Sequence, residues 1–131
     1  MIIRGKDLPV KRYDNMLGGR HHVDGQRYLE ETLSMGAIPF FGRATMPPGG
    51  SFGFHIQKCR PRGDMEIYYI VKGRAMVYDD DAREEIGPGD MLFCPNGMWN
   101  GMENIGDEEL EFISILVYAN PAHDPSLQPE Q

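Results

Sequence analysis

Short apolar segments separated by turn signals run along most of the chain. The segments are IPFFGRATM, SFGFHIQ, EIYYIV, RAMVY, MLFC and ELEFISILVY, which begin at residues 38, 51, 66, 74, 91 and 109. The intervening turn signals are PPGG at 47–50, KG at 72–73, DDD at 79–81, GPGD at 87–90 and PNG at 95–97. Aromatic and β-branched residues favour strands, and turns at this spacing are typical of a β-sandwich or barrel. The pattern predicts an all-β fold.

The two ends of the chain are less clearly patterned. Pro9 and the pair Gly18-Gly19 interrupt the first twenty residues, and YLEETLSM at 28–35 is compatible with either a helical turn or a strand. A Pro-rich segment begins at Pro121. We therefore predict a single domain over residues 1–131, with a barrel core at about 38–118, an N-terminal arm at 1–37 and a loosely ordered tail at 119–131.

Composition narrows the class of protein. Gly and Pro contribute 16 and 10 of the 131 residues, which disfavours a helical bundle. A net charge of −7 argues against nucleic-acid and membrane partners. The longest uncharged apolar run, at 113–119, is too short to span a bilayer of about 30 Å. Two cysteines cannot form a disulfide framework, and no secretory signal is evident, so we expect a cytoplasmic protein.

Two clusters carry the candidate chemistry. In the first, His55 and Gln57 share one face of a strand, and Glu66 on the next strand can come opposite them. In the second, Gly89, Pro95 and Gly97 fix the turns of the segment, and Asn100 opens the strand that follows. These residues are expected to face a common interior space.

The two clusters resemble the motifs of the cupin family. Gly49, His55, Glu66 and Gly73 match its first motif, while Gly89, Pro95, Gly97 and Asn104 match its second, and the resemblance extends from about residue 38 to 118. The resemblance implies a double-stranded β-helix, or jelly-roll barrel, of six to eight strands with a pocket inside. We adopt this as the expected fold, with a short N-terminal extension.

The departures from the family pattern concern its metal ligands. The resemblance implies a divalent metal held by three histidines and a glutamate, but Gln57 and Asn100 stand where two of those histidines are expected. The spacer before Glu66 is also four residues longer than the usual four. Neutral amides bind transition metals weakly. The sequence therefore predicts at most a weakly bound divalent metal at His55, Gln57, Glu66 and Asn100, with His55 and Glu66 as the candidate catalytic pair.

Several other side chains are candidates for the ligand pocket. Tyr68 and Tyr69 alternate, so one of them faces the interior, and Trp99 lies either at the pocket mouth or at a subunit interface. Arg60 and Arg62 stand in the loop that follows Gln57. They either recognise an anionic ligand or neutralise nearby acids such as Glu66.

Cysteine and histidine outside the motifs offer substitute metal ligands. Cys59 or Cys94 could replace a lost imidazole, although Cys94 lies in an apolar run that is typical of a core residue. One of His21 and His22 could point inward, and surface exposure is the simpler alternative. Asn104 is most simply a turn residue.

Two functional hypotheses follow. The first is a small-molecule-binding cupin that takes an anionic metabolite such as an organic acid or a sugar phosphate, with a weakened metal site. The alternative is a metal-dependent cupin enzyme of the isomerase, decarboxylase or dioxygenase type, so whether the chain is an enzyme stays open. Nine methionines and six tyrosines can supply an apolar sheet face, and we expect a homodimer.

Overall fold

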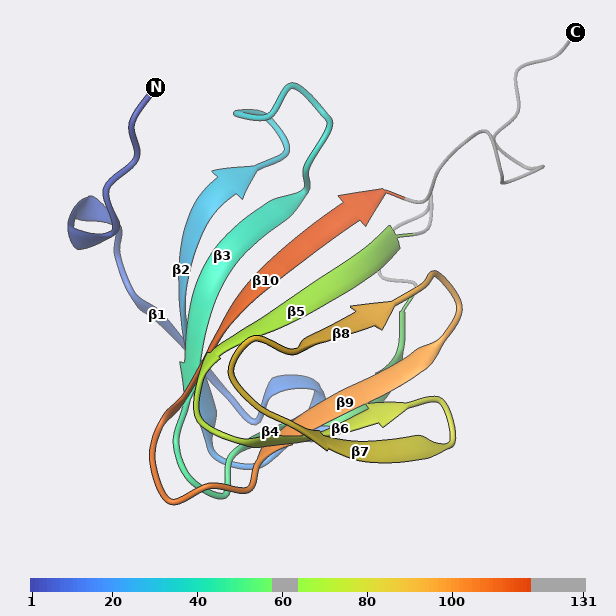
Figure 1. The fold of residues 1–131 in the computed structure, drawn as a ribbon. Coiled ribbons are helices and arrows are strands. Elements are labelled where there is room, and N and C mark those ends of the chain that lie inside the picture. The colour runs from blue at the N-terminus through green and yellow to red at the C-terminus, as the bar shows by residue number, and fades with distance from the viewer. Residues whose placement is uncertain (58–63, 119–131) are drawn as a thin grey trace, which may run out of the picture.

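Two antiparallel sheets face each other in the computed structural model, which describes residues 1–57 and 64–118 (Figure 1). The larger sheet has the strand order β1-β2-β3-β10-β5-β8, and the smaller one has the order β4-β9-β6-β7. The strands are β1 (Lys11–Asp14), β2 (His22–Glu30), β3 (Phe40–Met46), β4 (Ser51–Ile56), β5 (Asp64–Lys72), β6 (Ala75–Asp79), β7 (Ala82–Ile86), β8 (Met91–Cys94), β9 (Trp99–Asn104) and β10 (Leu110–Tyr118). The predicted jelly-roll fold is confirmed.

The turns lie where Gly, Pro and Asp interrupt the apolar pattern. All five predicted turn segments separate consecutive strands, from β3–β4 at residues 47–50 to β8–β9 at 95–97. At the β5–β6 turn, Gly73 has a φ of +93°, and a Cβ there would lie 3.1 Å from Leu110 Cα. Only glycine combines this backbone conformation with so close a neighbour.

Apolar side chains from both sheets form the core. Fully or nearly buried members come from β3 (Met46), β5 (Ile70), β9 (Met102) and β10 (Leu110). They occupy alternate strand positions, as expected when one face of each sheet is turned inward. Among the described residues there are no α-helices, and no helix is long and apolar enough to span a bilayer.

The N-terminal region contributes more to the barrel than its sequence indicates. β1 pairs with β2, and β2 pairs with β3, so residues 11–14 and 22–30 extend the larger sheet beyond the predicted core at 38–118. The ambiguous segment at 28–35 is divided, because β2 ends at Glu30 and turns follow. The Glu30 carboxylate accepts the backbone N–H of Leu33 at 2.7 Å, which stabilises this turn.

A short segment between β1 and β2 closes one part of the barrel. The 3-10 turn η2 (Met16–Gly18) packs against β4, while η1 (Gly5–Asp7) lies outside the sheets (Figure 1). A Cβ on Gly53 would lie 1.9 Å from the carbonyl oxygen of Leu17, so β4 and η2 touch backbone to backbone. This contact positions Met16 and Leu17 against the barrel interior.

Candidate functional site

A bulge in β4 sets which side chains enter the barrel. Phe52 and His55 both line the interior although they are three residues apart, because the pairing of β4 with β9 shifts register between them. Beyond the bulge the ordinary alternation resumes, so Gln57 is buried while Phe54 and Ile56 point outward. The bulge therefore allows an aromatic wall and a histidine to share one face.

An interior cavity of about 280 Å³ lies between the sheets. Its walls are mainly apolar and include Phe52, Phe112 and Leu116, while His55 and Glu66 supply chemically active groups. A mostly apolar lining with a few convergent polar groups is typical of a small-molecule site. This cavity is the candidate functional site.

The imidazole of His55 is oriented by its own strand. His55 Nδ1 lies 2.9 Å from the carbonyl oxygen of Gly53. Because a carbonyl oxygen can only accept, Nδ1 carries the proton in this contact, and Nε2 is left as the ring atom available to a ligand. The ring also packs edge-on to Phe52, with centroids 6.0 Å apart. His55 is thus held in one orientation at the cavity wall.

Glu66 is held by a neighbour on β10. Its side chain is nearly buried, and Oε1 accepts the hydroxyl proton of Ser114 at 2.6 Å. Ser114 is the polar residue among the inward positions of β10, where Leu110, Phe112 and Leu116 are apolar. A hydrogen bond to the carboxylate offsets part of the cost of its burial.

Gln57 and Asn100 form a buried network that also contains Asp64. Gln57 Nε2 donates to Asp64 Oδ1 at 2.7 Å, and Asn100 Nδ2 donates to Gln57 Oε1 at 3.3 Å. All three side chains have an exposed fraction of 0%. The two amides face inward, yet neither is among the residues that line the cavity. The structure therefore brings His55 and Glu66 to the cavity and places Gln57 and Asn100 beside it.

This donor set does not fit a transition-metal ion. His55 offers one imidazole, Glu66 already accepts from Ser114, and Gln57 Oε1 already accepts from Asn100. The buried Asn100 Oδ1 accepts no hydrogen bond within the described part of the chain, but an amide oxygen suits harder cations. Across residues 1–57 and 64–118, no three His, Cys, Asp or Glu side chains converge.

The cysteine and histidine substitutes lie elsewhere. Cys94 is buried, and burial raises the pKa of its thiol to about 12, with the charges of Glu66 and Asp79 adding to the effect. A thiol with this pKa stays protonated near neutral pH and is a poor metal ligand. His21 is exposed, and His22 Nε2 lies 4.0 Å from Asp24 Oδ2 rather than in the cavity. Cys59 lies outside the described residues.

The remaining candidates divide between the two faces of the sheets. Tyr68 is buried and lines the cavity, whereas Tyr69 points outward. The predicted placement of Trp99 at the pocket mouth is corrected by the structure. Asn100 takes the inward position on β9, so Trp99 lies on the outer face, away from the cavity. Arg60 and Arg62 lie outside the described residues. Asn104 anchors the β9–β10 turn by donating to the carbonyl oxygens of Met46 and Glu108.

Sequence reasoning missed the cavity residues from the N-terminal strands. Tyr13, Arg27 and Phe40 line the cavity, and Arg27 is exposed overall, so it lies at the rim. The Arg27 guanidinium carbon is 5.1 Å from the centroid of the Phe40 ring. No motif marks these positions. Ser114 did carry a signal, because it is the one small polar residue in the run FISILVY.

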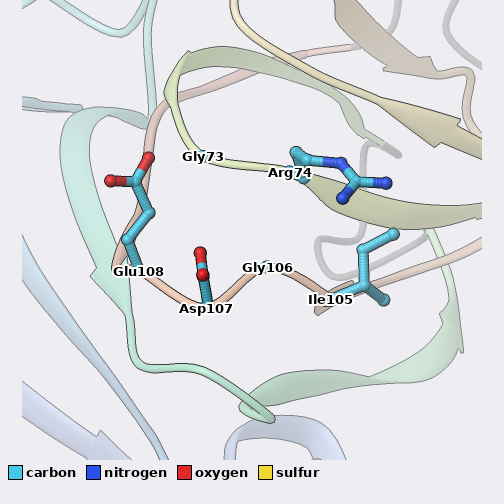
Figure 2. A pocket seen from close by; sticks show the side chains of 6 residues that line it. All are labelled: Gly73, Arg74, Ile105, Gly106, Asp107 and Glu108. Carbon is cyan, nitrogen blue, oxygen red and sulfur yellow. The ribbon is translucent and has the colours of Figure 1, made fainter.

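A separate surface hollow of about 370 Å³ lies between the β5–β6 turn and the β9–β10 loop. Figure 2 shows Asp107 and Glu108 on the loop side, opposite Gly73 and Arg74. The Arg74 guanidinium forms an ion pair with Glu85, so its charge is already neutralised. This hollow shares no lining residue with the cavity, and its lining contains neither a histidine nor a nucleophilic side chain.

The two sheets and their cavity define a double-stranded β-helix, and known proteins that resemble this chain have the same fold. The cupin domain family model matches residues 42–116. An oxalate-binding protein of Thermotoga maritima is 31% identical over 117 residues, which are 89% of this chain and 93% of that protein. The chain belongs to the cupin family.

Solved structures show the same fold. The crystal structure of a predicted oxalate decarboxylase from Thermotoga maritima superposes with a TM-score of 0.84 at 30% identity, covering 91% of this chain and all of that one. KdgF from Halomonas superposes with a TM-score of 0.72 at 11% identity, covering 92% of this chain and 94% of that one. At that identity the second match bears on the fold alone.

Proposed function

We propose that this protein binds a small organic acid in the interior cavity, with the acid carboxylate at the rim beside Arg27. The observation that carries the proposal is the cavity itself, which is lined by the exposed Arg27 as well as by His55 and Glu66. The similarity to an oxalate-binding protein supports the same class of ligand.

The size of the cavity restricts the ligand. A volume of about 280 Å³ lies just below the roughly 300–1,000 Å³ of ordinary ligand pockets. A compact acid of a few carbon atoms suits such a space. The net charge of −7 further favours a small ligand over nucleic acid, and we expect a cytoplasmic role.

Glu66 determines how the acid is oriented. Its carboxylate accepts from Ser114 and would repel a second ligand carboxylate placed beside it. A ligand hydroxyl or protonated carboxyl group, in contrast, could donate to Glu66 or to His55 Nε2. We therefore expect a hydroxy acid, or a diacid carrying one proton, to bind more tightly than a fully ionised diacid.

Calorimetric titration with glycolate, oxalate and acetate tests the proposal. Arg27→Gln should weaken glycolate binding by about tenfold, at the lower end of the range for a charged hydrogen bond, because Arg27 is exposed. Arg12→Gln is the matched control, since Arg12 is paired with Asp24 outside the cavity and should leave affinity unchanged. Equal losses in both variants, or no binding of any acid, would refute the proposal.

The metal-dependent alternative is tested in the same samples. Titrations are repeated with manganese present, and formate and carbon dioxide are measured after incubation with oxalate. Conversion of oxalate that depends on added metal and on Glu66 would favour the decarboxylase alternative over binding alone. The similarity to a predicted oxalate decarboxylase is the reason for choosing this reaction.

We also propose that the protein is a homodimer, joined through the outer face of β5 and β8. Tyr69, Val71, Met91 and Phe93 are between 41% and 53% exposed there, and Tyr69 pairs with Met91 across the two strands. β8 is also an edge strand of the larger sheet. Such a patch is typical of an interface. Light scattering should give a dimer mass at micromolar concentration, and Phe93→Glu should give a monomer.

A further inference from the structure

An exposed aromatic pair lies on the outer face of the smaller sheet, away from the cavity. This sheet is separate from the larger one that contains β5 and β8 (Figure 1). Phe54 on β4 and Trp99 on β9 are 53% and 44% exposed, and their ring centroids are 5.1 Å apart. Asp80 and Asp81 of the β6–β7 turn complete a hollow of about 540 Å³. The hollow therefore combines two aromatic side chains with two carboxylates.

The acidic side of this hollow is attached to the aromatic side. The backbone N–H of Trp99 donates to Asp80 Oδ1 at 2.9 Å, and the backbone N–H of Asp80 donates to the Trp99 carbonyl oxygen at 2.8 Å. These bonds hold the Asp80 carboxylate next to the Trp99 backbone, so its position does not depend on a flexible side chain alone. The two bonds therefore attach the β6–β7 turn to the start of β9, beside the aromatic pair.

Within the described part of the chain, neither carboxylate is paired with a cation. Within residues 1–57 and 64–118, no ion pair involves Asp80 or Asp81. Arg83, the nearest arginine in sequence, lies over the Tyr78 ring and 3.9 Å from Glu103 instead. The charged residues that line the hollow are both carboxylates, and aromatic faces are themselves attractive to cations.

We propose that this hollow, formed by Phe54, Trp99, Asp80 and Asp81, binds the alkylated ammonium group of a small organic cation. An alkylated ammonium is weakly hydrated, packs on the exposed face of an aromatic ring and requires a negative field rather than hydrogen-bond acceptors. Because the Phe54 and Trp99 rings are only 5.1 Å apart, the cation would lie against their exposed faces and not between them. A guanidinium group would instead seek a bidentate carboxylate, and at Asp80 it would compete with the backbone N–H of Trp99 for Oδ1, which leaves Asp81 as its one alternative in the hollow. The chemistry of the hollow therefore favours the alkylated cation.

Trp99 makes the site directly observable, because it is the single tryptophan of the chain. Choline is titrated into the native protein at constant ionic strength while tryptophan fluorescence is recorded. We expect a saturable change with a millimolar midpoint. The uncharged carbon analogue of choline, dimethylbutanol, should give at least tenfold weaker binding, because it has the same shape and lacks the charge.

Variants separate charge from shape. Asp80→Asn with Asp81→Asn should weaken choline binding by about tenfold, since asparagine keeps the Oδ1 acceptor for Trp99 and removes both charges. Glu84→Gln is the matched control, because Glu84 is an exposed carboxylate on β7 outside the hollow and should change nothing. Phe54→Leu should also weaken binding by at least threefold.

Three outcomes would overturn the proposal. The first is equal binding of choline and dimethylbutanol, which would show an apolar patch without cation selectivity. The second is tighter binding of arginine methyl ester than of choline. The third is a fluorescence change that follows protein concentration and not choline, which would assign this face to contact with a second copy of the chain.

Discussion

Replacing Gln57 by methionine should destabilise the protein by about 3 kcal/mol. Methionine keeps the length and volume of glutamine, so the change removes hydrogen bonds without leaving a cavity. The bond from Nε2 to the Asp64 carboxylate is 2.7 Å and charge-assisted, worth about 1.5–3 kcal/mol. The bond accepted from Asn100 is 3.3 Å and adds about 0.5–1 kcal/mol. Complete burial of all three side chains prevents water from replacing these bonds.

Urea unfolding, followed by circular dichroism, measures this loss as a lower midpoint at unchanged slope. For a chain of this length the melting temperature should fall by about 10 °C. Gln26→Met is the matched control, because Gln26 is half-buried and donates only to the carbonyl oxygens of Gly5 and Leu8. It should cost less than about 1 kcal/mol. If the two variants lose equal stability, the buried network does not have the energetic role assigned to it.

Three further predictions concern the metal, the buried thiol and the backbone contact at η2. Protein purified without chelator should contain less than one Fe, Ni, Zn or Mn ion per chain by elemental analysis. The double variant Gln57→His with Asn100→His should raise that metal content. One tightly bound metal ion per chain in the native protein would contradict this prediction. In a Cys59→Ser background, Ellman's reagent should label Cys94 only after unfolding. Because folding raises the pKa of Cys94 from 9.0 to about 12, its protonated form is favoured in the native state, and stability should fall as pH rises between these values. Gly53→Ala should destabilise by at least about 2 kcal/mol because its Cβ would overlap Leu17, whereas Gly87→Ala, with its nearest atom at 3.8 Å, should be tolerated in thermal melts.

Local sequence predicted the parts of this fold that depend on neighbouring residues. The segment EIYYIV and the turn at Gly73 appear where periodicity and turn chemistry indicate them. The inward positions of His55 and Gln57 follow from strand alternation, and so does the division of Tyr68 from Tyr69.

The remainder of the site depends on contacts between distant segments. β2 contains Gly25 and charged residues, and it is a strand because β1 and β3 pair with it on either side. Asp64 joins Gln57 and Asn100 only once β5 and β9 are folded against β4. Neither Arg27 nor Asp64 belongs to a motif, so neither could be identified before the strands were placed.

The closure of the cavity by the N-terminal strands and η2 has a consequence for how its selectivity can change. Seven of its fifteen lining residues precede residue 42, where the match to the family model begins. The half of the wall that carries His55 and Glu66 and the half that carries Tyr13 and Arg27 therefore belong to separable stretches of sequence. Libraries confined to residues 11–40 should alter which acids are accepted while leaving the histidine and glutamate in place, and a truncated chain that begins at residue 42 would lack nearly half of the binding surface.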